Sequence, residues 1–169
     1  MKACSFFGHR DTPKTEKLKE KVRETVERLI VEKGVVTFLF GNRSNFDELC
    51  HIVVSELQKK YPYIRRIAYL CKHETACLVG TATDLERQIK EIAGRDVRVR
   101  EFEEIKKSDR VNSAGRAAYV ERNQWMVDDS AFVIIYYEST KIVNKHSGTL
   151  LAYNYAKQKG KSLVVFNLQ

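Results

Sequence analysis

The chain has little of what marks linkers, exported proteins or membrane spans. Only two prolines and eight glycines occur among its 169 residues, so we expect no low-complexity linker or disordered tail. No apolar run approaches the roughly 20 residues of a membrane-spanning helix, and no signal peptide is visible at the N-terminus. We therefore expect a cytoplasmic protein without membrane contact, folded as one domain over residues 1–169.

Cysteine is also sparse, and its spacing points away from disulfides and metals. The four cysteines, at positions 4, 50, 71 and 77, contain no CxxC pair. In a chain without an export signal we expect them to be reduced and buried. Cys71, His73 and Cys77 match no standard zinc pattern, so we predict no metal site and no other cofactor.

The chain carries an excess of positive charge. Its content is 43% hydrophobic and 31% charged, which is ordinary for a globular protein, but its net charge is +8. In residues 14–33 lysines and glutamates intermix around an apolar stripe, which is typical of a solvated helix face. A second basic stretch, residues 95–116, has fewer acidic residues at its ends than in its middle, and we interpret it as partly functional. An overall basic balance is compatible with a multiply anionic ligand, an acidic lipid surface or a nucleic acid. The lack of a series of interleaved aromatics makes nucleic acid the less favoured partner.

Short apolar runs alternate with amphipathic segments along the whole chain. Strands are expected at residues 4–7, 35–40, 66–71, 131–137 and 163–166, with a weaker, charge-flanked edge strand around 97–102. Helices are expected between them, in residues 12–34, 45–61, 83–94, 116–129 and 149–159. Thr12 is the expected cap of the first helix, with Pro13 at its first position. Glycine is expected to end the first and last helices, at Gly34 and Gly160. The inward residues of the first helix are expected to be Leu18, Val22, Val26, Leu29 and Ile30. This order predicts βαβ units, hence an α/β, three-layer Rossmann-like fold with a mostly parallel sheet.

Three polar, glycine-bearing breaks follow strands of the predicted sheet. If the strands are parallel, the breaks meet in one crevice outside the carboxyl ends, where open α/β sheets bind ligands. Glycine lets the backbone approach a ligand, and a helix start offers unpaired N–H groups to an anion. We therefore predict a nucleotide-type, phosphate-bearing small molecule as the partner. The candidate binding residues are Gly8, His9, Arg10, Gly41, Asn42, Arg43, Ser44, Asp47, Arg116, Asn123, Ser147, Gly148 and Thr149.

Several of these residues also have a purely structural interpretation. Asp47 and Glu48 fall in the first turn of a helix, where the helix dipole stabilises carboxylates. They are equally well explained as groups that bind ribose hydroxyls or activate water, and they are the only, weak, catalytic candidates. Ser147 is an everyday N-cap. Tyr136, Tyr137 and Tyr153 are near enough in sequence to supply a stacking face for a base, but aromatics at such positions are more often part of the core.

The motifs, taken in order, resemble the SLOG superfamily, the Rossmann-like group of Smf/DprA-type DNA-processing proteins and LOG-type phosphoribohydrolases. Within it they are most similar to a branch of bacterial proteins known mainly as a domain of unknown function. The resemblance covers nearly the whole chain apart from roughly residues 72–112. It is carried by Phe6-Phe7-Gly8-His9-Arg10-Asp11-Thr12-Pro13, Gly41-Asn42 leading to Phe46-Asp47, Tyr61-Pro62, Arg122-Asn123-Gln124-Trp125-Met126, Ser147-Gly148-Thr149 and Lys159-Gly160-Lys161.

The resemblance implies a Rossmann-like fold that binds nucleotides or ADP-ribose-like signals, and a homodimer. Two departures matter. Ser44-Asn45 stand where relatives often carry a glycine pair, and Thr149 is followed by Leu150-Leu151-Ala152 rather than by the catalytic glutamate of LOG-type enzymes. The second departure argues against LOG-like hydrolysis. The leading hypothesis is a sensor or sequestering protein; a nucleotide hydrolase and a DNA-processing accessory protein are the alternatives.

Overall fold

The predicted α/β, Rossmann-like architecture is confirmed. The computed structural model describes residues 2–9, 12–41, 44–71, 78–80, 99–108, 116–137 and 148–167. Six parallel strands form one sheet in the order β6-β3-β2-β1-β7-β8. They are β1 (Lys2–Gly8), β2 (Val35–Phe40), β3 (Arg65–Leu70), β6 (Glu104–Lys107), β7 (Phe132–Tyr137) and β8 (Ser162–Asn167).

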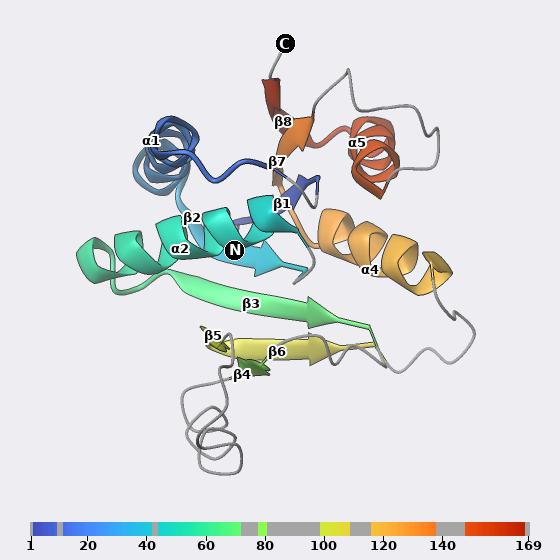
Figure 1. The fold of residues 1–169 in the computed structure, drawn as a ribbon, viewed down its shortest axis with the longest axis horizontal. Helices are drawn as coiled ribbons and strands as arrows, with labels where there is room; N and C mark the ends of the chain where they lie inside the picture. Colours follow the sequence, from blue (N-terminus) through green and yellow to red (C-terminus); the bar gives the residue numbers. More distant parts are fainter. Residues whose placement is uncertain are drawn as a thin grey trace.

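Four described helices flank this sheet, two on each face (Figure 1). They are α1 (Glu16–Lys33), α2 (Asn45–Lys60), α4 (Arg116–Asp128) and α5 (Gly148–Gln158). Along β1, Cys4 and Phe6 belong to the core under α1 and α2, whereas Ala3 and Phe7 belong to the core under α4 and α5. Because both faces are covered, the inner strands are apolar at nearly every position, as is typical of parallel sheets.

The first helix has the predicted apolar stripe but a different start. Its five predicted inward residues are buried, and Gly34 ends it with a left-handed φ of 69°. The predicted cap, Thr12, is wrong: the helix begins after Thr15, whose side chain accepts a hydrogen bond from the Leu18 N–H. The Thr12 hydroxyl instead donates to the His9 carbonyl at 2.7 Å, so it closes the turn after β1.

The edge strand lies later in the sequence than predicted. Residues 99–101 form β5, which pairs with the short β4 (Leu78–Gly80) in a separate two-stranded sheet, and the edge of the main sheet is β6. The reason is that Arg100 and Phe102 are both buried, so this segment covers one end of the core before the chain joins β3. The helix predicted at residues 83–94 lies outside the described residues.

The cysteines behave as buried side chains. Cys4, Cys50 and Cys71 are free thiols inside the protein, and burial raises the pKa of the Cys4 and Cys50 thiols well above the ordinary range. Cys77 lies outside the described residues. Within the described part of the chain, no helix is long and apolar enough to cross a membrane. The same residues contain no group of three potential metal ligands.

Candidate functional site

The order of the strands reverses between β1 and β7. From β1 the chain proceeds through β2 and β3 to β6 on one side, and from β7 to β8 on the other. Open α/β sheets bind ligands at the carboxyl ends of the strands beside such a reversal. The last pair of the β1–β7 ladder, Gly8 with Tyr136, lies at this point. The carboxyl ends of β1, β2 and β7 therefore lie along one edge of the sheet.

Gly8 makes room for a side chain from the first turn of α2. A Cβ on Gly8 would lie 2.4 Å from the Phe46 Cβ and 2.6 Å from its Cγ. The Phe46 ring is fully buried, with its centroid 5.5 Å from that of Tyr136. The missing side chain at position 8 is thus used for the close approach of α2 to the sheet. The space beside Gly8 is therefore filled by Phe46, and any contact of Gly8 with a ligand would have to come from its backbone groups.

Gly41 is held on both sides by charged side chains. Its N–H donates to Asp47 Oδ1 at 3.0 Å, and its carbonyl accepts a hydrogen bond from Arg122 Nη1. The other Asp47 oxygen, Oδ2, lies 2.8 Å from Arg100 Nη1, and both of these side chains are 5% exposed. A Cβ on Gly41 would lie 3.2 Å from the Arg122 Cζ. These contacts make Asp47 part of a buried ion pair at the start of α2.

Helix α4 connects this cluster to the start of α5. Arg122 Nε donates to Asn123 Oδ1 at 3.2 Å, and Asn123 Nδ2 lies 3.8 Å from the place of a Cβ on Gly148. Gly148 itself is exposed, and Thr149 beside it is buried. The structure thus brings Gly41, Asn123 and Gly148 together through α4.

A half-buried aromatic stack borders the same edge. The rings of Tyr137 and Tyr153 are stacked with centroids 6.0 Å apart, and the His9 ring lies 6.2 Å from that of Tyr137. Tyr136 is fully buried and belongs to the core. Of the three tyrosines considered from the sequence, Tyr137 and Tyr153 are therefore the two with surface to offer a flat ligand.

The other predicted site residues divide into two groups. Ser44 caps α2, because its hydroxyl accepts from the Asp47 N–H at 3.0 Å, and Glu48 forms an ion pair with Lys14 at 2.7 Å. Asp47 and Glu48, the two weak catalytic candidates, are thus both in ion pairs. The remaining candidates, Arg10, Asn42, Arg43, Ser147 and the side chain of Arg116, lie outside the described residues.

Sequence reasoning missed the role of Arg100. It was grouped with the basic stretch of residues 95–116 that pointed to an anionic partner, but its guanidinium is buried, 5.2 Å from the Phe102 ring centroid and 5.8 Å from that of Phe40. The apolar neighbours Val99 and Phe102 were the available signal, since a solvated basic stretch has no need of them.

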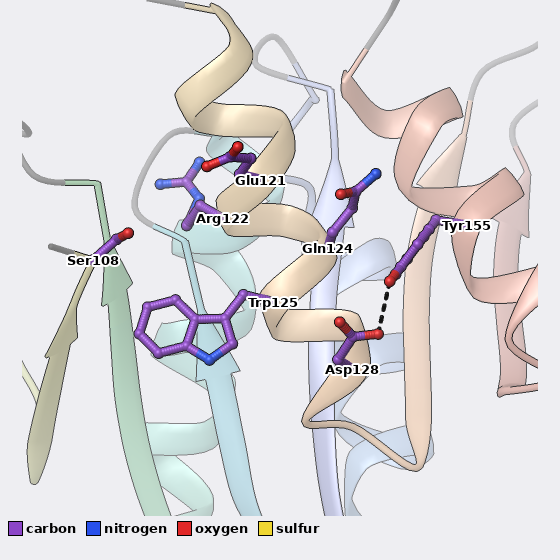
Figure 2. Close-up of a pocket in the computed structure, with 7 residues that line it drawn as sticks. All are labelled: Ser108, Glu121, Arg122, Gln124, Trp125, Asp128 and Tyr155. Carbon is purple, nitrogen blue, oxygen red and sulfur yellow. Dashed lines mark hydrogen bonds between the residues drawn. The ribbon is translucent and has the colours of Figure 1, made fainter. Parts of the chain in front are cut away.

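A pocket of about 440 Å³ lies along α4, and Arg122 is part of its wall (Figure 2). This volume is within the range of small-molecule pockets, roughly 300–1,000 Å³. The Tyr155 hydroxyl donates to Asp128 Oδ1 at 2.8 Å on one side of it. Its described lining is Ser108, Glu121, Arg122, Gln124, Trp125, Asp128 and Tyr155. With two carboxylates in that lining, the pocket suits a phosphate less well than the strand ends do.

His51 joins α2 to the segment that carries Arg100. Its Nε2 lies 2.8 Å from the Glu101 carbonyl oxygen, so Nε2 carries the proton and donates it. The ring packs against Phe40 and Phe102, at centroid distances of 5.4 and 4.8 Å. Burial, followed by the positive charge of Arg100, lowers the pKa of His51 to about 4. Arg66 contributes to the same downward shift of this pKa, and the Glu101 carbonyl and Asp47 oppose it.

We expect His51 to make the protein less stable in mild acid. Between pH 6.5 and about 4 the unfolded chain binds a proton on His51 that the folded chain does not, so stability is lost as the pH falls through this window. The expected contribution is about 2 kcal/mol of unfolding free energy between about pH 8 and about pH 5. Urea unfolding of the wild type and of His51→Gln, which keeps a donor for Glu101 but does not titrate, measures it. Parallel pH curves for the two proteins would rule the effect out.

Comparison with known proteins supplies a distant homologue. The chain is 27% identical over 144 residues to YoqJ of Bacillus subtilis (strain 168), an uncharacterized SPbeta prophage-derived protein. The match covers 84% of this chain and 81% of that protein. No protein-family model matches the chain. The homology therefore supports a shared domain over most of both chains, and it carries no activity with it.

Proposed function

We propose that this protein binds a nucleotide or nucleotide-derived small molecule, such as an ADP-ribose-like signal, at the carboxyl ends of β1, β2 and β7, as a cytoplasmic sensor or sequestering protein. The observation that carries the proposal is the convergence of Gly8, Gly41 and Gly148 at the reversal of strand order. The SLOG-like order of motifs supports the same ligand class.

The chemistry at this edge fits the two parts of a nucleotide. The exposed start of α5 at Gly148 offers N–H groups and the positive end of a helix dipole to a phosphate. The Tyr137–Tyr153 stack offers a flat apolar face to a base. A net charge of +8 favours the approach of an anion.

A thermal shift screen tests the proposal. A ligand present at one hundred times its Kd adds about 2.7 kcal/mol of stability. In a chain of this size we expect that to raise Tm by roughly 5–10 °C. The panel contains mononucleotides, dinucleotides, cyclic nucleotides and ADP-ribose, each also in high salt. No shift with any of them would contradict the proposal.

Gly148→Asp sharpens the test, because the free and liganded proteins should respond in opposite directions. The site has room for a side chain, since a Cβ would meet nothing closer than Asn123 Nδ2 at 3.8 Å. A carboxylate at a helix start stabilises the free protein by roughly 0.3–1 kcal/mol, yet it repels a bound phosphate. We expect an unchanged or higher Tm without ligand and a lost ligand shift. Gly148→Asn, which is similar in size and neutral, is the matched control and should keep the shift.

Mass spectrometry of the ligand after long incubation separates binding from hydrolysis. Asp47 and Glu48 are both in ion pairs, so the site geometry gives hydrolysis no support. A cleaved product that requires either carboxylate would replace the binding proposal by the hydrolase. Binding of DNA that falls steeply with salt would favour the accessory protein instead.

A further inference from the structure

Gly41 is a residue at the proposed site whose two backbone polar groups are both bound by charged side chains, one from α2 and one from α4. It is the first residue after β2, and it precedes by three positions Ser44, the cap of α2. The side chains that bind its N–H and its carbonyl therefore fix the backbone at the carboxyl end of β2.

We infer that Arg122 and the Arg100–Asp47 pair are positioning residues, which hold the Gly41 backbone in place at the carboxyl end of β2, beside the proposed ligand site. Arg122 lies 81 residues from Gly41 in the chain and binds its carbonyl from α4. Asp47 binds its N–H from α2 and is itself bound by Arg100 from β5. The ligand side of this inference rests on the proposed function, and the backbone side does not.

Burial and charge give these contacts their strength. Arg122, Arg100 and Asp47 are all buried. Hydrogen bonds with one charged partner are shorter and about twice as strong as neutral ones, and little water competes for buried ones. The Arg122 guanidinium also packs 5.5 Å from the Tyr119 ring centroid and donates to Asn123. Together with the Gly41 carbonyl, these contacts fix its position from three directions. The absence of a side chain on Gly41 is what allows this approach, because a Cβ would come within 3.2–3.3 Å of the guanidinium.

Arginine is required here because of its shape. A planar guanidinium can donate to the Gly41 carbonyl and to Asn123 Oδ1 at once, whereas a lysine ammonium is a compact, strongly hydrated charge on a flexible stem. Arg122→Lys keeps the charge and should restore only part of the function lost in Arg122→Gln. This graded response distinguishes positioning by geometry from a general need for positive charge.

Amide hydrogen exchange of Gly41, measured by NMR on the full chain, tests the inference without any ligand. With eight glycines in the sequence, the glycine amides can be assigned individually. In Arg122→Gln we expect exchange at Gly41 to accelerate about tenfold or more, and in Arg122→Lys by less, because local opening sets the exchange rate. The Ile134 amide in β7 reports the global fold and should keep its wild-type rate. Unchanged exchange at Gly41 in folded Arg122→Gln overturns the inference.

Binding of ADP-ribose, used as the probe, tests the link to the ligand. We expect its Kd to rise about tenfold in Arg122→Gln, and less in Arg122→Lys, at a temperature where both variants are fully folded. The matched control is Arg65→Gln, which removes an arginine paired with Glu104 at 3.3 Å. Arg65 is the first residue of β3, at the opposite end of the parallel strands from the proposed site, so its replacement should change neither readout. Faster exchange with unchanged affinity would disprove the positioning role. If the wild type binds no ADP-ribose, the proposed ligand class loses its probe, while the exchange result still decides whether Arg122 holds Gly41.

If Arg122→Gln fails to fold, Asp47→Asn tests the other contact that holds the Gly41 backbone. The amide keeps a carbonyl oxygen for the Gly41 N–H but loses the ion pair with Arg100. Accelerated exchange at Gly41 supports the inference, and a wild-type rate in a folded variant contradicts it.

Discussion

Replacement of Arg100 by methionine should cost about 3–5 kcal/mol of unfolding free energy, because it removes one partner of a buried ion pair. The two side chains are 2.8 Å apart and 5% exposed, so water cannot take over the role of the guanidinium. Methionine preserves most of the apolar volume next to Phe40 and Phe102. The loss is therefore assigned to charge rather than to a cavity. Urea unfolding measures it, and Tm should fall by roughly 6–20 °C.

A second substitution separates this explanation from general damage to the core. Asp47→Asn, added to Arg100→Met, also removes the negative charge of the pair but keeps an acceptor for the Gly41 N–H. The double variant should therefore be more stable than Arg100→Met alone. Arg65→Met, which breaks the exposed pair with Glu104, is the surface control and should cost less than about 1 kcal/mol. A double variant that loses the sum of both single effects would show that the pair is not coupled.

Gly8→Ala should be the most damaging addition of a single methyl group, at about 3 kcal/mol. The new Cβ would lie 2.4 Å from the Phe46 Cβ, which is fixed to the backbone of α2 and cannot rotate away. Either α2 must move from the carboxyl edge of β1 or the strand must bend. We expect Tm to fall by roughly 6–12 °C and the binding edge to be distorted.

Gly148→Ala is the matched control for this substitution. It adds the same methyl group at the same edge, but its nearest neighbour would be Asn123 Nδ2 at the ordinary contact distance of 3.8 Å. Alanine also has a higher helix propensity than glycine, so stability should be unchanged or slightly higher. Equal losses in the two variants would mean that contact with Phe46 is not the reason for glycine at position 8.

Local patterns were sufficient for most of the fold. The apolar stripe of α1 and the strands β1, β2, β3, β7 and β8 are present where the sequence predicts them, because helix and strand patterns are a property of neighbouring residues. The sharp stops at Gly34 and Gly160, with φ of 69° and 68°, were also predicted from glycine at a helix end. The cap of α1 was not: Thr12 and Thr15 are equally good by residue type, and the turn after β1 takes Thr12.

The site depended on contacts that no local pattern contains. From the sequence, Gly8 and Gly41 were glycines for a ligand and Asp47 was a possible base, and those binding roles stay predictions. The tertiary structure shows that Phe46 fills the space beside Gly8, and that Arg100 and Arg122 reach Gly41 and Asp47 from remote segments. Periodicity within the chain thus determined which segments are strands and helices and which of their faces are apolar. Only packing decided which strands are neighbours and which buried charges meet, because those partners are set by three-dimensional proximity between residues far apart in sequence.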